Sequence, residues 1–155
     1  GIWQTVWMEA VASEGLKDMV IRTDIDQKQL VATPSFYKES DNILEIILKD
    51  GDKVISKKQA TCSNNTCIVL PVKNMKLWSP ESPFLYELTY LVKDKSGKVL
   101  DKVESYTGMR KIHISDGIFY LNNQPYFQRL VLDQGYYPDG IWTAPSDEAL
   151  KNDII

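Results

Sequence analysis

The sequence is poor in the residue types that most often hold metal ions. Its 155 residues include one histidine, His113, and two cysteines, Cys62 and Cys67. A zinc site built from protein alone uses about four nitrogen and sulfur ligands, so we expect no metal site and no other cofactor. No constellation of cysteine, serine and carboxylate surrounds His113 in the sequence. We therefore predict a solvent-facing strand residue rather than a catalytic base at this position.

Long hydrophobic runs and clusters of positive charge are also missing. No apolar run approaches the ~20 residues that span a bilayer as a helix, so no membrane span is expected. The 18 basic and 21 acidic residues give a net charge of −3, and the lysines and arginines are scattered along the sequence. Neither nucleic acid nor an anionic membrane is therefore expected as a partner.

What the sequence does contain is a succession of short strands and tight turns. Strand-like runs occupy residues 19–25, 30–36, 44–48, 54–55, 86–92 and 99–106. Asp50-Gly51 and Ser96-Gly97 mark two hairpin turns, because glycine adopts the positive φ that such turns require. These runs, without a helical period, predict an all-β fold: an antiparallel β-sandwich of immunoglobulin type over residues 12–110.

The segment from Cys62 to Cys67 has two interpretations. If Asn64 and Asn65 form a two-residue turn, the cysteines become a facing pair in neighbouring strands, close enough for a disulfide. A bridge would indicate an oxidising compartment, such as the periplasm or the exterior of the cell. Two reduced cysteines in neighbouring strands are the alternative.

Two prolines lie among the aromatic residues of Leu77–Tyr86. Prolines in this arrangement fix a rigid crossover, beneath which rings are buried. A platform that stacks on sugar rings is the functional alternative. We favour the structural role for Trp78 and Tyr86, because a strand that joins the core begins directly after them.

The pattern changes after Ile112. Residues 112–121 are strand-like, and Phe127–Leu132 is nearly continuous in apolar character, as expected for a strand covered on both faces. An acidic, aromatic loop follows, and Ser146 is placed to cap a helix that begins with Asp147 and Glu148. A strand, a loop and a helix form the first half of a βαβ unit.

Several motifs resemble glycoside hydrolase family 2, the group of β-galactosidases, β-glucuronidases and β-mannosidases. They occur in the family's order over essentially the whole chain. The start resembles the last strand of its sugar-binding jelly roll, and Leu77–Leu88 resembles its Trp-x-Pro-x-x-Pro-x-Leu-Tyr signature. Gly108-Met-Arg110 resembles the Gly-x-Arg that ends its immunoglobulin-like domain. Phe119–Tyr126 is similar to the Phe-x-Leu-Asn-Gly-x-Pro hairpin that precedes its TIM barrel.

The resemblance implies three parts. Residues 1–11 would end the jelly roll, residues 12–110 would form the immunoglobulin-like domain, and residues 111–155 would begin the barrel with its first hairpin, strand and helix start. The implied parent enzyme hydrolyses terminal β-glycosides, β-galactosides above all, by a retaining mechanism with two glutamates. Both glutamates belong to later barrel strands, so this chain would be inactive alone, with no catalytic residue of its own.

The resemblance also implies where sugar would be bound. Asp133 and Gln134, at the carboxyl end of the first barrel strand, are the expected substrate-binding residues in the intact enzyme. Arg129 is expected to be a buried partner in a structural ion pair. The sequence departs from the family at Leu130, where Gly is common, and at Gln134, where many β-galactosidases have histidine, which leaves the substrate subtype open.

A second class of function remains to be tested. A freestanding carbohydrate-binding or adhesion module would use exposed aromatic residues, namely Trp78, Tyr136, Tyr137 and Trp142. The two hypotheses imply different partners. A domain of an enzyme would contact the flanking jelly roll and barrel, and the intact protein its carbohydrate substrate, whereas a module would bind sugar by itself.

Overall fold

The computed structural model describes residues 5–132 and 135–155. Its contacts divide into two compact units. The larger unit is Val11–Phe127, and the smaller one combines the described parts of Gly1–Ala10 and Gln128–Ile155. All strands of the described chain belong to the larger unit, and the single helix of the described chain belongs to the smaller one.

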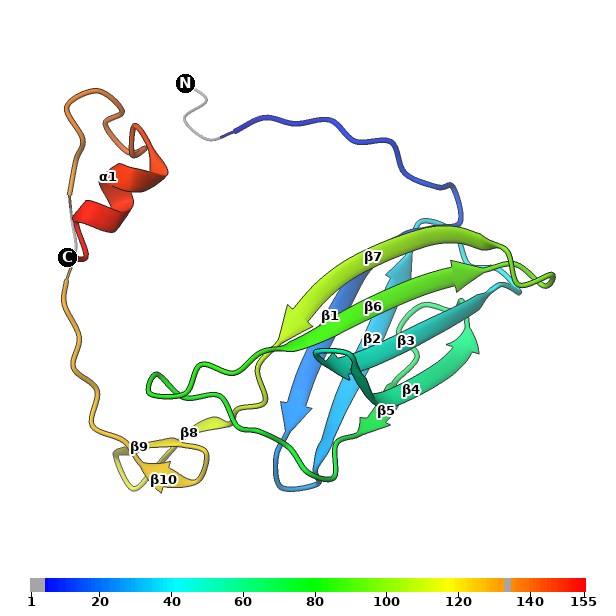
Figure 1. The fold of residues 1–155 in the computed structure, drawn as a ribbon, viewed down its shortest axis with the longest axis horizontal. Helices are drawn as coiled ribbons and strands as arrows, with labels where there is room; N and C mark the ends of the chain where they lie inside the picture. The colour runs from blue at the N-terminus through cyan, green and yellow to red at the C-terminus, as the bar shows by residue number, and fades with distance from the viewer. Residues whose placement is uncertain (1–4, 133–134) are drawn as a thin grey trace. The chain divides into compact units, whose positions relative to one another are not determined.

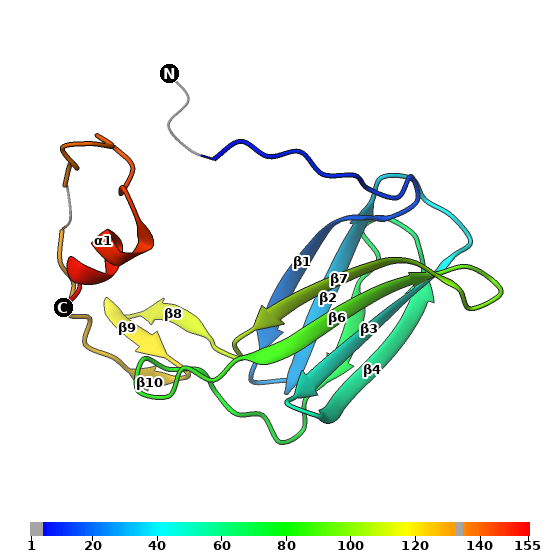
Figure 2. The same ribbon diagram turned by 45° about the horizontal axis from the view of Figure 1, so that its top comes forward.

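The larger unit is built on a sandwich of two antiparallel sheets (Figures 1 and 2). The three-stranded sheet has the order β1-β2-β5 and consists of β1 (Leu16–Asp24), β2 (Gln29–Phe36) and β5 (Ile68–Pro71). The four-stranded sheet has the order β4-β3-β6-β7 and consists of β3 (Ile43–Asp50), β4 (Lys53–Thr61), β6 (Tyr86–Lys93) and β7 (Val99–Thr107). The predicted all-β sandwich is confirmed.

The core lies between the two sheets and follows the alternation in the sequence. Leu44, Ile46 and Leu48 of β3 are fully buried, because every second side chain of a strand faces the same side. The same rule places alternate residues of β2 and β6 inside. The buried apolar residues form one cluster: Leu30, Ala32, Phe36, Leu44, Ile46, Leu48, Cys62, Ile68, Leu70, Val72, Tyr86, Leu88, Tyr90, Val92 and Met109.

One edge of the sandwich is formed by β1 and β7, which belong to different sheets and run in the same direction (Figures 1 and 2). The two strands are joined where they begin: the backbone N–H of Leu16 donates to Oδ2 of Asp101 at 2.9 Å. The chain therefore enters the sandwich at one end of this edge and leaves it, after Thr107, at the other.

A small sheet follows the sandwich within the same unit. It consists of β8 (Ile112–Ser115), β9 (Ile118–Leu121) and β10 (Gln124–Pro125) in the order β10-β9-β8. Its turns at Asp116-Gly117 and Asn122-Asn123 have positive φ throughout, as two-residue hairpin turns require. The predicted hairpin is confirmed. The placement of a domain boundary after residue 110 stays a prediction.

His113 on β8 is not the solvent-facing residue that we predicted. It is half-buried, and its ring stacks on that of Tyr120 with centroids 4.8 Å apart. The two residues lie opposite each other in the β8–β9 register, so their rings cover one another on one face of the small sheet. This contact covers part of the ring surface.

Of the two interpretations of the segment from Cys62 to Cys67, the structure agrees with reduced cysteines and not with a disulfide. Both thiols are free; Cys62 is buried in the core and Cys67 is exposed. The expected hairpin does not form, because β4 pairs with β3 in one sheet while β5 pairs with β2 in the other. The segment between them crosses from sheet to sheet. Asn64 fixes this crossing, as its Oδ1 accepts from the backbone N–H of Phe36 at 2.7 Å.

The predicted strands outside the sandwich unit are not formed. Described residues 5–10 and 128–132 have no strand, and Leu130, Val131 and Leu132 are 79%, 94% and 84% exposed. A strand covered on both faces requires neighbouring strands, and the described residues of this unit contain none. Arg129 in this segment is exposed as well, so the buried ion pair expected for it in the intact enzyme stays a prediction.

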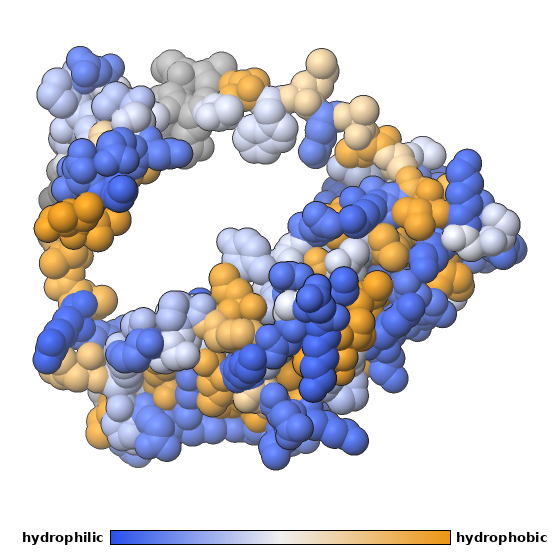
Figure 3. All heavy atoms as spheres, in the orientation of Figure 1, coloured by the Kyte–Doolittle hydropathy of each residue, from blue (hydrophilic) through white to orange (hydrophobic). Residues whose placement is uncertain are grey.

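The predicted helix is confirmed as α1 (Asp147–Asn152). Its N-cap is Ser146, whose side chain accepts from the backbone N–H of Ala149 at 3.2 Å. Asp147 and Glu148 occupy the first turn, where the helix dipole favours negative charge. No helix in the described part of the chain is long and apolar enough to cross a membrane. Figure 3 shows apolar side chains open to solvent around the C-terminus, where Ile155 is 93% exposed.

Candidate functional site

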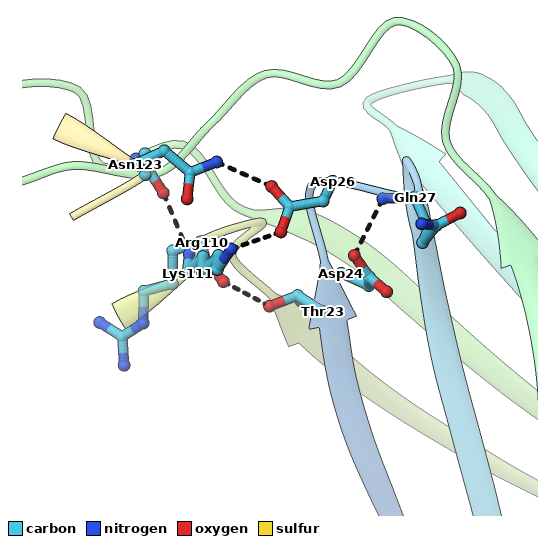
Figure 4. Close-up of polar contacts among 8 residues, drawn as sticks. Thr23, Asp24, Asp26, Gln27, Arg110, Lys111 and Asn123 are labelled. Carbon is cyan, nitrogen blue, oxygen red and sulfur yellow. Dashed lines mark hydrogen bonds and ion pairs between the residues drawn. The ribbon is translucent and has the colours of Figure 1, made fainter. Parts of the chain in front are cut away.

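Polar contacts tie the small sheet to the end of the sandwich (Figure 4). The hydroxyl of Thr23, near the end of β1, donates to the carbonyl of Arg110 at 2.6 Å. In the turn after β1, Asp26 forms an ion pair with Lys111 and accepts at 2.7 Å from the amide of Asn123. Hydrogen bonds from Lys111 and then Asn123 lower the pKa of Asp26, so its carboxylate stays charged. We call these five residues and Asn122 the junction network.

Asn122 completes the junction network from the turn between β9 and β10. Its Oδ1 accepts from the backbone N–H of Lys111 at 3.1 Å, and its Nδ2 donates to the carbonyl of Trp78 at 2.9 Å. One side chain thus connects three segments that are distant in the sequence. The small sheet is held to the sandwich by several contacts rather than by the chain alone.

Trp78 has the structural role that we favoured. Its backbone N–H donates to the carbonyl of Met109 at 2.9 Å, and the Arg110 guanidinium lies 4.7 Å from the centre of its ring. A Cβ added to Gly108 would lie 3.1 Å from three atoms of the Trp78 side chain. Glycine therefore allows this close approach, and the covered ring is a poor platform for a sugar.

A groove opens beside the junction network, between the far ends of β1 and β7. Its volume is about 630 Å³. The lining is mostly apolar and includes Ile21, Leu85, Tyr106 and Ile112, together with Arg110. Tyr106 is 70% exposed and Leu85 is 47% exposed. Exposed apolar side chains beside an arginine are typical of protein interfaces rather than of hydrolytic sites.

A protein-family profile matches the part of the chain that forms the sandwich. The sequence profile described as "Glycosyl hydrolases family 2" matches residues 5–110, which contain the whole sandwich. The chain belongs to glycosyl hydrolase family 2. The resemblance drawn from the motifs is thereby confirmed. The family match ends at Arg110, which belongs to the junction network.

Individual relatives in family 2 are much longer than this chain. A β-galactosidase of Lactococcus lactis subsp. lactis is 30% identical over 158 residues, which cover 99% of this chain and 15% of the relative. A β-galactosidase of Clostridium acetobutylicum is 30% identical over 78% of this chain and 14% of the relative. The chain thus spans about one seventh of the length of these curated relatives.

Solved structures support the fold. The crystal structure of Ruminococcus gnavus β-glucuronidase matches with a TM-score of 0.64 and 20% identity, covering 77% of this chain and 20% of that one. At this identity the likeness concerns the arrangement of the strands alone. It agrees with the sandwich described above.

Glu45, on β3, is the only buried carboxylate among the described residues. Burial raises its pKa, but hydrogen bonds from Lys93, Lys57 and Gln59 outweigh this effect and lower the pKa to about 2. A general acid must hold a proton near neutral pH, so Glu45 cannot fill that role.

The residues predicted to bind substrate, Asp133 and Gln134, lie outside the described residues, so their role stays a prediction. Among the described residues, no group of three or more His, Cys, Asp and Glu side chains is arranged to hold a metal ion. The residues that sequence reasoning missed are those of the junction network. Asp26 and Lys111 lie 85 positions apart, and no local pattern in the sequence pairs them.

Proposed function

We propose that the chain is a non-catalytic, immunoglobulin-like domain of a larger family 2 β-glycosidase. One observation supports this above all: the family match covers the sandwich, while the chain spans about one seventh of relatives that are named as β-galactosidases. On this proposal residues 1–11 end a jelly roll and residues 111–155 begin a TIM barrel. The flanking domains are then the partners of the sandwich.

The parent enzyme hydrolyses terminal β-galactosides with retention of configuration. Two glutamates about 5–5.5 Å apart act as nucleophile and as acid and base, and both belong to the remaining part of the barrel. Several relatives are β-galactosidases, which supports a β-galactoside as the substrate. In the intact enzyme, Asp133 and Gln134 contact the sugar at the end of the first barrel strand.

The junction network supports a structural role for this domain. Thr23, Asp26 and Trp78 from the sandwich each hold a residue of the segment 110–123. The sandwich therefore holds the start of the segment that leads to Phe127 in place. A catalytic site built from several loops requires a rigid support, because small displacements of catalytic groups lower the rate by large factors.

Activity assays test this proposal. We expect the 155-residue chain to show no turnover of o-nitrophenyl β-galactoside, whereas the full-length protein encoded by its gene cleaves it. Turnover by the isolated chain would contradict the assignment, and so would a gene that stops soon after Ile155. Cleavage of a β-glucuronide instead of the galactoside by the full-length protein would keep the family and overturn the substrate.

One observation favours a second candidate, the sugar-binding module. The rings of Tyr136 and Trp142 lie with centroids 4.6 Å apart and are 64% and 62% exposed. Exposed aromatic faces can stack on the C–H faces of sugars. Titration of the chain with galactose, followed by tryptophan fluorescence, separates the two candidates: tight binding that Trp142→Ala abolishes would favour the module.

A further inference from the structure

A second groove lies at the opposite edge of the sandwich, where β4 and β5 end the two sheets. Its volume is about 570 Å³. The groove is lined by Asp50, Lys53, Val54, Ile55, Ser56, Lys58, Pro71, Lys73, Asn74 and Lys76. Four lysines thus converge here, two from β4 and two from the loop that follows β5. Figure 3 shows hydrophilic side chains projecting around the β3–β4 turn at this edge.

Three of these lysines lie outside the ion pairs of the described residues. Lys53, Lys58 and Lys73 form no ion pair with any described residue, whereas Lys76 pairs with Asp50 at 2.6 Å and lies 4.4 Å from the centre of the Phe84 ring. The groove is therefore locally positive in a chain whose net charge is −3. Like charges that share a groove repel one another, and an anion bound between them relieves this repulsion.

Lys58 shows that the charge belongs to the groove rather than to the outer surface. In the β3–β4 register Lys58 lies opposite Ile46, a fully buried core residue. Residues opposite each other in a sheet point to the same face, so Lys58 lies on the inner face of the sheet, at its edge. Its ammonium group is available to a ligand that enters between the sheets.

The remaining lining indicates the chemistry of the ligand. Ser56 and Asn74 offer hydrogen bonds, and Val54, Ile55 and Pro71 form an apolar wall. No aromatic side chain lines the groove, so it lacks the stacking platforms that single-stranded nucleic acids use. A volume of about 570 Å³ lies within the usual range of about 300–1,000 Å³ for small-ligand sites. It is far larger than an inorganic anion requires.

We propose that this groove binds an anionic oligosaccharide, with Lys53, Lys58 and Lys73 contacting its acidic groups. Ser56 and Asn74 donate to or accept from its hydroxyl groups, and the apolar wall packs against its ring C–H groups. Carboxylated and sulfated sugars share the required chemistry. The site belongs to the sandwich itself and does not depend on whether the chain is part of a glycosidase.

The test uses the 155-residue chain in affinity electrophoresis and isothermal titration calorimetry. The probes are polygalacturonate, which is carboxylated, heparin, which is sulfated, the neutral polymer dextran, and a dT oligonucleotide. The first variant replaces Lys53, Lys58 and Lys73 together by glutamine. The matched control replaces three lysines outside the groove, Lys17, Lys28 and Lys98, which likewise form no ion pair with any described residue.

We expect one or both acidic polymers to bind and dextran not to bind. The groove variant raises Kd by at least about tenfold, while the control variant changes it by less than about twofold. A third variant with arginine at the three groove positions keeps the charge and retains binding. The relative affinity for polygalacturonate and heparin distinguishes carboxylated from sulfated ligands.

Four outcomes would overturn the proposal. Equal losses in the groove and control variants would mean a response to overall charge alone. Tighter binding of a dT oligonucleotide than of either acidic polymer would mean a different class of ligand. Loss of binding in the arginine variant would mean that charge does not carry recognition. If neither acidic polymer binds at low salt, the lysines only keep the β4 edge from pairing with other chains.

Discussion

The carboxylate of Glu45 accepts a hydrogen bond of 2.7 Å from Nζ of Lys93, and Glu45 is 2% exposed although it lies on the outer face of its sheet. Its neighbours Leu44 and Ile46 point into the core. Glu45 is covered instead by the side chains of the strands on either side. Lys57 completes the ion pairs from β4 at 2.9 Å. The outer face of the four-stranded sheet therefore contains a buried, fully paired carboxylate.

We expect Glu45 to make the stability of the sandwich depend on acid pH. Its pKa is lowered from 4.5 to about 2 in the folded protein, so its contribution is present above pH ~4.5 and is lost as the pH falls toward ~2. The free energy of unfolding should decrease over this window by roughly 3 kcal/mol from this residue. Urea denaturation at pH 7, 5, 4, 3 and 2 measures the decrease.

Glu45→Gln is the control for this dependence, because glutamine cannot ionise. Other carboxylates, such as Asp26 and Asp94, also have lowered pKa values and contribute in both proteins. The difference between wild type and variant isolates the contribution of Glu45. Identical pH profiles of the two proteins would show that the ion pairs with Lys93 and Lys57 add nothing to stability.

The two cysteines should differ sharply in reactivity. Burial, together with the charge of Glu14, raises the pKa of Cys62 to about 11, while Cys67 is exposed. The thiolate is the reactive form, so one thiol per chain should react with a disulfide reagent under native conditions and two in denaturant. Cys67→Ser should abolish the native reaction. Rapid modification of two thiols in the native protein would contradict the burial of Cys62.

Tyr86→Phe should destabilise the sandwich by about 1–2 kcal/mol. The hydroxyl of Tyr86 accepts from the backbone N–H of Lys76 at 2.7 Å, and without it this part-buried donor loses its partner. Tyr106→Phe is the matched control, since Tyr106 is 70% exposed and surface changes of this kind stay within about 0.5 kcal/mol. Chemical denaturation compares the variants, and equal effects would rule out a special role for the Tyr86 hydroxyl.

Asn122→Ala should loosen the small sheet without unfolding the sandwich. The substitution removes the hydrogen bonds to Lys111 and Trp78 and places alanine at a φ of 53°, for a combined cost of about 2–3 kcal/mol. Amide hydrogen exchange should speed up in β8 and β9 and stay unchanged in β3 and β6.

Asn122→Gly separates the two contributions, because glycine adopts this φ without strain. The glycine variant should show the part of the effect that comes from the lost hydrogen bonds. Unchanged exchange in β8 and β9 for both variants would mean that the junction network does not hold the small sheet.

The sandwich could be predicted well because its strands and turns depend on residues that are close together in the sequence. Leu44, Ile46 and Leu48 alternate with more polar residues, and Asp50-Gly51 supplies a turn that few other residues allow. The hairpin of β3 and β4 and its core residues could be predicted from one continuous stretch of sequence. The cap at Ser146 is local in the same sense.

The failures of prediction involve contacts between distant segments. Whether Cys62 continues a hairpin or enters a crossover depends on the partner of β5, which lies in the other sheet. Lys58 and Lys73 are well separated in the sequence, yet both line the same groove in the folded chain. The strand predicted at Phe127–Leu132 has the right composition, but composition cannot supply neighbouring strands.

The shared direction of β1 and β7 determines how the sandwich would carry a pulling force. Tension applied before Leu16 enters one sheet through β1, and tension applied after Thr107 enters the other sheet through β7. The load would slide the two sheets past each other along the core, instead of peeling one strand from its neighbour. Many contacts must then break at once, so the sandwich should act as a stiff spacer, about 25–30 Å long for strands of nine residues.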